Sequence, residues 1–378
     1  MKLAFVFPPM LVGGRPLDFG AIDTSPRGTT GSEMQILSIA REMAARGHSA
    51  TLYIDDPNRG EWMNVALRPF QGLHGDRDLY QAICTSLDIN VARWVSPTSA
   101  YRVVFQQLND FNYANGKDFA DFVDLFVSPS FVHQQFMEES WPTTKGKWEM
   151  LPNGCYPAEL AMRPEDVRVP GRMIYASSPD RGLHLLLQEW LEIRKACPQA
   201  HLKIFYYSLQ SWIDRWKTHT IENPAWHWHF KENFRRAKYI DRALHVLKDQ
   251  GIEVVGPVSR RQLADEMRQA EVLAYPCDTI AWTEGFSCAT LEGCASGALP
   301  IISAMDALGS IYETACPMVP APARKHMPEW RNLVVRALTD KPWAEGWRRK
   351  GAAFAGAAYG WPVLAERLER ILEKRLPR

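Results

Sequence analysis

The sequence predicts an α/β protein with two domains, because one pattern of strand, loop and helix begins twice along the chain. The first pattern starts at residues 3–7 (LAFVF) and the second at residues 172–178 (RMIYASS). Repeated units of this kind build doubly wound parallel sheets, the arrangement called Rossmann-like. A chain of 378 residues with 46% hydrophobic residues is long enough for two such cores.

The first domain is predicted to open with such a unit. After the first strand, a loop rich in Gly and Pro ends in residues 28–33 (GTTGSE), and apolar side chains then recur with helical spacing. We expect Ser32 to cap this helix and Gly47 to end it. Residues 49–54 (SATLYI) return as the second strand.

The rest of the chain continues the alternation. In the first domain, further strands are predicted at residues 101–106, 124–130 and 147–154, the last ending in Pro-Asn-Gly. A change of composition at residues 162–172 (MRPEDVRVPGR) indicates a linker. We therefore predict a first domain over residues 1–168, a second over residues 169–355, and a terminal helix over residues 356–378.

The second domain is organised around residues 283–300 (TEGFSCATLEGCASGALP). This stretch follows a predicted buried strand at residues 271–277, and a helix is expected to begin near Ser287. The first turn of a helix presents free N–H groups, here from about Phe286 to Ala289, and such groups bind anions. A strand, a loop and a helix N-terminus form the usual phosphate site of open α/β sheets.

Two carboxylates, Glu284 and Glu292, lie within this stretch. The helix is otherwise made of small and apolar residues, so we expect it to be buried, and a buried carboxylate needs a partner. Glu292, about two turns into the helix, is placed to accept hydrogen bonds from ribose hydroxyls. Although a glutamate at a helix start is more often only favourable to the helix dipole, this context favours a nucleotide-diphosphate site.

At these residues the sequence resembles the retaining, family 4 glycosyltransferases of the GT-B fold. Their E-x7-E signature is matched by Glu284 and Glu292, within a longer pattern of strand, Pro, an E-G-F triplet, E-x-x-A/C-x-G and Pro. The last part is matched by Glu292, Cys294, Gly297 and Pro300. The resemblance implies two facing Rossmann-like domains, with a terminal helix that crosses back to the first domain and begins at Trp361.

The resemblance also implies an activity. It implies transfer of a sugar from a nucleotide-diphosphate sugar, of the UDP or GDP type, to a glycan, a lipid-linked molecule or another hydroxyl acceptor, as in polysaccharide biosynthesis. Retention of anomeric configuration is expected, with no cofactor and no required metal.

The family's site residues carry over to named positions of this chain. Arg181 would neutralise the leaving diphosphate together with the N–H groups of the helix start, and Glu284 would orient hydroxyls of the donor sugar. Glu292 would hold the ribose. The other implied contacts are Gly285, Phe286 and Ser287 at the diphosphate, Gly256, Pro257 and Val258 around the nucleobase, and Gly28, Thr30 and Gly31 in the glycine loop of the first domain.

Two family features are missing from the sequence. Many relatives have a histidine after the strand at residues 101–106 that reaches the donor sugar, whereas this chain offers Gln106, Gln107, Asn109 and Asp110, and the spacing selects none of them. A second basic residue usually precedes Arg181 in its loop, but residues 176–178 carry no charge.

Composition excludes several other classes of protein. A net charge of +1 gives no electrostatic basis for binding nucleic acid. The seven cysteines include no C-x-x-C pair and predict neither a zinc site nor a disulfide framework, so a reducing cytoplasm fits best. Residues 74–80, which contain Asp-x-Asp, are interpreted as a solvated loop, and His227 and His229, taken as alternating neighbours of a strand-like segment, as structural.

Residues 208–250 are rich in aromatic and basic side chains. One interpretation is an interfacial helix that contacts anionic lipid near a lipid-linked acceptor, which would place the protein at the cytoplasmic face of a membrane. The preferred alternative is an ordinary helix with a solvated charged face and buried rings.

Two other functions remain open from the sequence. A nucleotide-sugar epimerase can share this fold, although the E-G-F triplet with its two glutamates argues against it. A catalytically silent, sugar-nucleotide-binding partner subunit is the non-enzyme alternative, and the missing histidine and basic residue make it plausible.

Overall fold

The computed structural model describes residues 1–7, 17–54, 58–86, 89–109, 111, 119–206, 208–218 and 227–376. The chain forms two compact units, each built around a mainly parallel sheet, as the sequence predicted. The first unit comprises Met1–Ile22, Thr29–Gly154 and Ala358–Arg378, and the second comprises Asp23–Gly28 and Cys155–Ala357.

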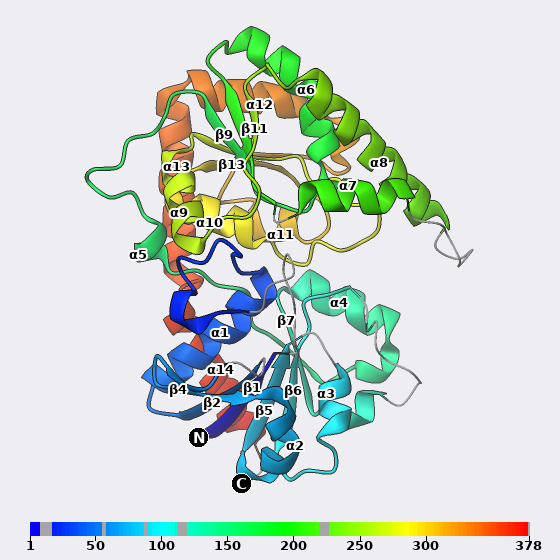
Figure 1. Ribbon diagram of the computed structural model, residues 1–378, viewed down its shortest axis with the longest axis vertical. Coiled ribbons are helices and arrows are strands. Elements are labelled where there is room, and N and C mark those ends of the chain that lie inside the picture. Colours follow the sequence, from blue (N-terminus) through cyan, green and yellow to red (C-terminus); the bar gives the residue numbers. More distant parts are fainter. Residues whose placement is uncertain are drawn as a thin grey trace. The chain divides into compact units, whose positions relative to one another are not determined.

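The first unit contains an eight-stranded sheet with the order β3-β4-β2-β1-β5-β6-β7-β8 (Figure 1). All neighbouring strands are parallel except β3 and β4. The strands are β1 Lys2–Val6, β2 Ser49–Ile54, β3 Gly60–Trp62, β4 Val65–Pro69, β5 Ala82–Ser86, β6 Tyr101–Phe105, β7 Leu125–Ser128 and β8 Trp148–Met150.

The helices of this unit follow the strands in the usual alternation. They are α1 Gly31–Ala45, α2 Leu73–Asp76, α3 Ile89–Trp94, α4 Phe131–Ser140 and α14 Trp361–Arg375. Short 3-10 helices are η1 Phe19–Ala21, η2 Phe70–Gly72, η3 Arg77–Leu79, η4 Phe119–Phe122 and η5 Pro142–Thr144.

The N-cap of helix α1 lies two residues before Ser32, the predicted cap. Thr30 is the N-cap: its Oγ1 accepts a hydrogen bond from the Glu33 N–H at 3.3 Å, and Glu33 Oε2 accepts one from the Thr30 N–H at 2.7 Å. This reciprocal capping box satisfies two backbone donors at once. Gly47 follows the helix with a φ of 88°, as expected of a glycine stop.

The Asp-x-Asp stretch is largely exposed to solvent, as the sequence suggested, but it is helical and not a loop. Residues 74–80 fall largely in α2 and η3, and Asp76 Oδ2 accepts hydrogen bonds from Tyr53 Oη at 2.7 Å and Arg68 Nη1 at 2.5 Å. These contacts lower the pKa of Asp76, with the Tyr53 hydrogen bond as the largest cause. The carboxylate therefore serves the packing of this unit.

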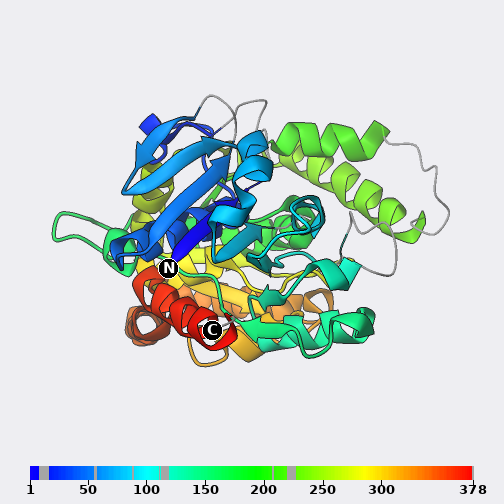
Figure 2. The same cartoon turned by 90° about the horizontal axis from the view of Figure 1, so that it is seen from below.

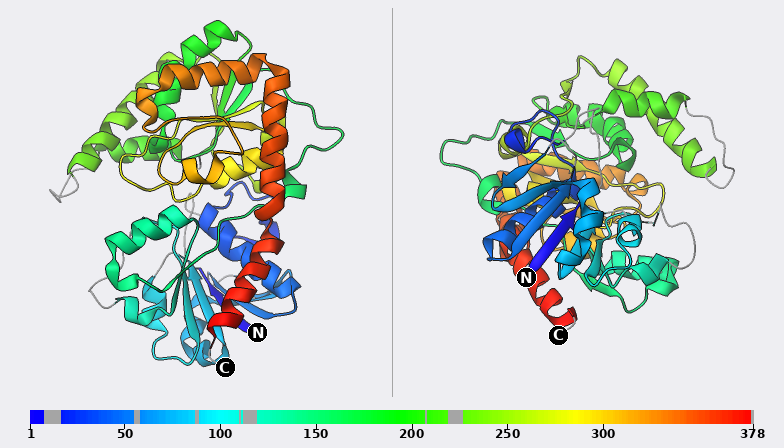
Figure 3. Two further views of the ribbon diagram at one scale, coloured as in Figure 1. Left: turned by 180° about the vertical axis from the view of Figure 1, so that it is seen from behind. Right: turned by 60° about the horizontal axis from the view of Figure 1, so that its bottom comes forward.

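Helix α14 completes the first unit, although the chain reaches it only after the second unit. It lies beside α1 (Figure 3), and Glu369 accepts hydrogen bonds from Arg46 and interacts with His48 Nε2 at 2.7 Å. Trp361 begins the helix and is buried. A Cβ on Gly154 would lie 2.8 Å from the Trp361 ring, so only glycine allows this close packing.

The second unit contains a six-stranded parallel sheet with the order β11-β10-β9-β12-β13-β14. Its strands are β9 Arg172–Tyr175, β10 His201–Ile204, β11 Ile252–Val254, β12 Val272–Tyr275, β13 Leu299–Ser303 and β14 Met318–Val319. The chain moves outward from β9 to β11 and then returns to β12 on the other side of β9. The strand order therefore reverses between β9 and β12, which is where open α/β sheets bind ligands.

The helices of the second unit connect these strands. They are α5 Pro157–Leu160, α6 Leu183–Ala196, α7 Leu209–Thr218, α8 His227–Val246, α9 Arg260–Gln269, α10 Cys288–Ser296, α11 Leu308–Tyr312, α12 Met327–Thr339 and α13 Lys341–Ala358, with 3-10 helices η6 Pro179–Arg181 and η8 Ala323–Lys325. Helices α7 and α8 pack together as a pair (Figure 2). Within the described residues, no helix is both long and apolar enough to span a membrane.

The first unit ends at Gly154, whereas the sequence predicted a boundary at residue 168. Residues after Gly154 already pack on the second unit: Arg268 Nη1 donates a hydrogen bond to the Glu159 carbonyl at 2.7 Å, and Arg168 Nη1 donates one to the Ala270 carbonyl at 2.9 Å. Composition marks the polar stretch at residues 162–172 but cannot show which unit its side chains contact.

One glycine is essential where the two central loops of the second unit meet. Gly182 lies between η6 and α6 with a φ of 124°, and a Cβ there would come within 2.1 Å of the Pro276 carbonyl oxygen. Both the backbone conformation and the close approach therefore require glycine.

We predict that Gly182→Ala lowers the free energy of unfolding by at least about 3 kcal/mol, because strain and a backbone clash add together. Gly346→Ala in α13 is the control, since no atom lies within 4 Å of a Cβ at that position. This control should change stability by less than about 1 kcal/mol, in the stabilising direction. Urea unfolding followed by circular dichroism measures both, and equal midpoints for the two variants would contradict the prediction.

Candidate functional site

The candidate site lies at the carboxyl ends of β9 and β12, where the strand order reverses. The loop after β9 carries Arg181, and the loop after β12 runs through Glu284 to the start of α10. The loops are in direct contact, because the Asp278 N–H donates a hydrogen bond to the Arg181 carbonyl at 3.4 Å. The structure thus brings together Arg181 and Glu284, which are 103 residues apart in sequence.

Arg181 and Glu284 form an ion pair. Arg181 Nη1 donates a hydrogen bond to Glu284 Oε2 at 2.8 Å, and Tyr275 Oη donates a second one to the same oxygen. Burial opposes the charged guanidinium, but Glu284 together with Tyr275, Asp180 and Cys277 outweighs it and raises the pKa of Arg181 above its usual range. Arg181 Nε is buried and makes no hydrogen bond within the part of the chain that the structure describes, so it retains a donor for a ligand.

The backbone of Glu284 is held by a side chain that the sequence did not single out. Asp306 Oδ2 accepts hydrogen bonds from the N–H groups of Thr283 at 3.0 Å and Glu284 at 2.9 Å. It also accepts one from Thr279 Oγ1 at 3.0 Å. Asp306 itself has a φ of 50°, a conformation that aspartate tolerates better than most residues. Its position is therefore fixed by the loop that it organises.

Helix α10 begins at Cys288, close to the predicted position. Ser287 is its N-cap and accepts a hydrogen bond from the Thr290 N–H at 3.2 Å, and Tyr312 Oη donates one to the Ser287 carbonyl at 2.9 Å. Phe286 is buried against Tyr312, with 5.9 Å between the ring centroids. These contacts fix the direction of the helix start.

One predicted anion donor is already engaged. The Gly285 N–H donates a hydrogen bond to the Thr283 carbonyl at 3.1 Å, which closes a tight turn before the helix. The expectation that the N–H groups of Gly285, Phe286 and Ser287 act together on a diphosphate is therefore corrected for Gly285. In this structure the Gly285 N–H stabilises the turn before the helix.

Glu292 is buried, as predicted, but it has a protein partner. Arg260 Nη2 donates a hydrogen bond to Glu292 Oε1 at 2.7 Å. Arg260 is the first residue of α9, after Ser259, which caps that helix. Burial opposes the charge of Arg260, but Glu292 raises its pKa, and Glu292 likewise adds to the burial that raises the pKa of Cys288 to about 12. No sequence signal paired these two residues, which are 32 positions apart.

One residue of the predicted glycine loop, Gly28, lies beside the predicted nucleobase loop. Gly28 belongs to the second unit, where a Cβ on it would lie 2.8 Å from the Val258 carbonyl oxygen. Gly256 has a φ of 84°, and Pro257 lies between it and Val258. The segment is anchored by a hydrogen bond from the Arg261 N–H to the Asp23 carbonyl at 3.1 Å.

Thr30 and Gly31 belong to the first unit, unlike Gly28. Thr30 is engaged in the capping box, where its hydroxyl donates to Glu33 Oε2 at 3.0 Å, and Gly31 is the first residue of α1. The three residues of the predicted glycine loop are therefore divided between two units.

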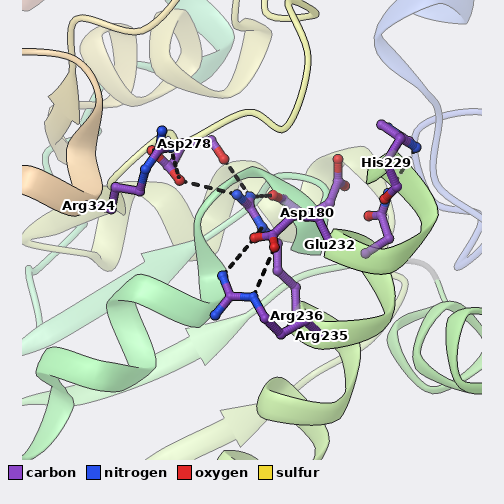
Figure 4. Close-up of polar contacts among 8 residues, drawn as sticks. Asp180, His229, Glu232, Arg235, Arg236, Asp278 and Arg324 are labelled. Carbon is purple, nitrogen blue, oxygen red and sulfur yellow. Dashed lines mark hydrogen bonds and ion pairs between the residues drawn. The ribbon is translucent and has the colours of Figure 1, made fainter. Parts of the chain in front are cut away.

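A cluster of ionic residues that the sequence did not predict braces the loops of the site (Figure 4). Asp278 has 0% exposure, and Arg236 of α8, with 3% exposure, donates from Nη2 to Asp278 Oδ2 at 3.2 Å. Arg324 of η8 reaches the same carboxylate from another side, with Nη1 at 2.9 Å from Oδ1. A buried carboxylate with two arginine partners is stabilised in its charged form.

Arg236 also holds the backbone next to Arg181. Its Nη1 donates hydrogen bonds to the carbonyl oxygens of Asp180 and Asp278, and its Nε donates one to Glu232 Oε1 at 2.9 Å. Helix α8 thus ties the loop after β9 to the loop after β12. Arg236 lies within residues 208–250, whose sequence indicated a lipid-facing or solvated helix. The charge pattern of that helix does not distinguish Arg236 from its basic neighbours.

The four candidates for the missing histidine have different surroundings. Gln106 is buried and its Nε2 donates a hydrogen bond to the Leu108 carbonyl at 3.0 Å, while Gln107 Oε1 accepts one from Asn153 Nδ2 at 2.8 Å. Asn109 is half-buried, and Asp110 lies outside the described residues. Gln107 is therefore the candidate paired with a second predicted residue, Asn153 of the Pro-Asn-Gly turn.

Metal ligation finds no support in the described part of the chain, where no group of three or more His, Cys, Asp or Glu side chains is arranged to hold an ion. His227 and His229 lie in the first turn of α8 and not in a strand-like segment, because that segment is helical. A ring nitrogen of His229 lies 3.3 Å from Asn233 Nδ2. All seven cysteines are free thiols.

Comparisons with known proteins identify the fold of this chain but do not assign it to a sequence family. No protein-family model matches the chain, and no curated protein matches it. Among solved structures, sucrose-phosphate synthase from Thermosynechococcus elongatus is similar, with a TM-score of 0.68, 14% identity and coverage of 99% of both chains. HepE from Anabaena, in complex with UDP-glucose, has a TM-score of 0.67 at 12% identity and covers 98% of this chain and 99% of its own.

A third structure agrees with these two. AviGT4, a glycosyltransferase involved in avilamycin A biosynthesis, has a TM-score of 0.66 at 13% identity and covers 99% of this chain and 98% of its own. These similarities extend over the whole chain at low identity. They show that the chain has the two-domain α/β fold of GT-B glycosyltransferases, as the sequence predicted.

Proposed function

We propose that this protein transfers a sugar from a UDP- or GDP-sugar to a hydroxyl acceptor, with retention of anomeric configuration and without a metal ion. The observation that carries the proposal is the Arg181–Glu284 pair at the point where the strand order reverses, directly before the N-terminus of α10. A cation, a carboxylate and a helix start in one crevice are what a phosphorylated sugar donor requires.

The chemistry follows from where charge develops. Cleavage of the bond between the sugar and the phosphate builds negative charge on the leaving diphosphate. Arg181 is fixed by Glu284 through Nη1 and keeps Nε as a donor, so it can stabilise that charge without reorganising. Glu284, held by Tyr275 and by its own backbone, is positioned to orient hydroxyl groups of the donor sugar.

Glu292 and Arg260 extend the site along the nucleotide. A carboxylate that is hydrogen-bonded by a guanidinium keeps a defined orientation, which suits it to accept hydrogen bonds from ribose hydroxyls. The structures of HepE in complex with UDP and with UDP-glucose support a nucleotide-sugar donor for a chain of this fold. The acceptor that we propose is a glycan, a lipid-linked molecule or another hydroxyl compound.

We predict that Glu292→Gln weakens nucleotide binding by roughly 1.5–3 kcal/mol, the value of one hydrogen bond to a charged group. The measurement is a thermal-shift panel of UDP, GDP, ADP, CMP and dTDP with their common sugars, in which one nucleotide class should stabilise the wild type. The control is Glu189→Gln, which removes a charge paired with Arg331 at 2.8 Å. Equal nucleotide shifts in wild type and Glu292→Gln would remove Glu292 from the site.

We predict that Arg181→Ala lowers the turnover of the selected nucleotide sugar by about 100-fold or more, a larger effect than on donor binding, because the leaving-group charge is greatest in the transition state. Release of nucleotide diphosphate, with Arg331→Ala as control, measures this. Full turnover in Arg181→Ala would exclude the proposed role. Donor binding by a wild type that never turns over would indicate the partner subunit, and an isomerised donor would indicate the epimerase.

We also propose that helix α8 contacts anionic lipid at the cytoplasmic face of a membrane. Its aromatic side chains Trp228, Phe234 and Tyr239 are exposed, and so are the cations Lys231, Lys238 and Arg242. The Lys238 ammonium lies 5.2 Å from the centre of the Phe234 ring. Exposed rings beside cations are typical of surfaces that bind the membrane interface.

The double variant Lys231→Glu/Lys238→Glu should weaken binding to vesicles that contain phosphatidylglycerol by at least about tenfold, since each cation near such a surface contributes about 1 kcal/mol. Vesicle co-sedimentation measures the effect. Lys195→Glu/Lys325→Glu, which reverses two exposed charges elsewhere in the second unit, should bind as the wild type does. Equal binding to pure phosphatidylcholine vesicles, or no loss in the double variant, would contradict the proposal.

A further inference from the structure

The carboxyl edge of the sheet in the first unit is lined by uncharged polar side chains. Ser86 is the last residue of β5, Gln107 lies two residues after β6, and Asn153 lies three residues after β8. These strands run parallel, so their carboxyl ends lie along one edge. This edge therefore presents hydroxyl and amide groups from strands far apart in sequence.

Gln107 and Asn153 form an amide pair with unused hydrogen-bonding capacity. Asn153 Nδ2 donates to Gln107 Oε1 at 2.8 Å, which leaves Gln107 Nε2 as a donor and Asn153 Oδ1 as an acceptor. Both of these atoms are buried and make no hydrogen bond within the described part of the chain, and Asn153 has only 4% exposure. Ser86 Oγ is likewise buried and makes no hydrogen bond within the described residues.

Buried polar atoms without partners are costly. Each such atom destabilises a protein, and folded proteins normally satisfy these atoms with protein, water or a ligand. A site with one free donor and one free acceptor fits a hydroxyl group, which accepts and donates at the same time. The amide pair is thus matched to a hydroxyl better than to a purely anionic group.

The charge state of the residues around the amide pair also favours a hydroxyl ligand over an anionic one. His133, whose Nε2 lies 3.0 Å from the Leu108 carbonyl oxygen in the loop that follows Gln107, is buried, and burial lowers its pKa to about 4. Its imidazole is therefore neutral at pH 7. Ser86, Gln107, Asn153 and this neutral imidazole carry no charge, unlike Arg181 and Arg260 of the second unit.

We propose that the Gln107–Asn153 amide pair binds a hydroxyl group of a carbohydrate substrate, with Gln107 Nε2 donating to the hydroxyl oxygen and Asn153 Oδ1 accepting its proton. The inference rests on the proposed glycosyl transfer. The hydroxyl belongs either to the sugar of the nucleotide donor or to a sugar acceptor, since both present the same group.

The test compares wild type with Gln107→Met, which keeps the length of the side chain and removes the amide. Gln134→Met in α4 is the control, because Gln134 donates to Glu138 at 3.2 Å on the same unit. Gln107→Glu is the second variant: it keeps an acceptor for Asn153 Nδ2 and removes only the donor. Urea midpoints show that each variant is folded before binding is compared.

The donor arm measures the affinities of UDP-glucose and UDP by titration calorimetry. If the hydroxyl belongs to the donor sugar, the preference for UDP-glucose over UDP falls about fivefold in both Gln107 variants, as expected for one neutral hydrogen bond, while UDP affinity is unchanged. The acceptor arm measures saturation-transfer NMR signals of free glucose, galactose, mannose and N-acetylglucosamine in the presence of UDP-glucose. A loss in this arm alone assigns the hydroxyl to an acceptor.

Either loss supports the proposal if Gln134→Met behaves as the wild type. No difference between wild type and the Gln107 variants with any probe overturns it and leaves a structural water as the partner of the amide pair. A wild type that binds neither UDP nor GDP would instead overturn the proposed function. The free-sugar signals, measured again without nucleotide, would then still decide whether the amide pair binds a hydroxyl.

Discussion

The ion pair between Arg181 and Glu284 is the interaction on which the candidate site depends. It links the loop after β9 to the loop after β12, and each partner is held by further contacts that would have no purpose without it. Asp306 fixes the backbone of Glu284, and Arg236 fixes the carbonyl next to Arg181. A buried pair of this kind stabilises little by itself, but it holds the two charged side chains in a single arrangement.

Much of the fold could be predicted because it follows from local patterns in the sequence. Alternating strands and helices, the Ser259 cap and the glycine after α1 depend on neighbours within a few positions. The start of α10 and the burial of Glu292 followed from the small apolar residues around them. Where two caps were locally possible, as with Thr30 and Ser32, the local pattern did not select between them, and the structure uses Thr30 with Glu33.

The partners of the site residues could not be predicted, because they depend on pairings across long stretches of chain. Arg260 meets Glu292, Arg236 meets Asp278, and Gln107 meets Asn153, with separations of 32, 42 and 46 residues. No spacing rule connects such residues, and each is ordinary in its own segment. The division of Gly28 from Thr30 and Gly31 is a similar case, since a continuous loop motif gives no sign that its residues pack on different units.

The chain also enters and leaves the first unit more than once, and helix α14 joins that unit only after the whole second unit has been made. During synthesis, α1, Gly154 and the adjoining core must therefore wait for Trp361 and the rest of α14 while the second unit emerges from the ribosome. Domains usually fold in the order in which they are synthesised, but the first unit of this chain cannot complete its fold before the second unit has been synthesised. A nascent chain of this protein therefore exposes the apolar surface that α14 covers until α14 itself has been synthesised.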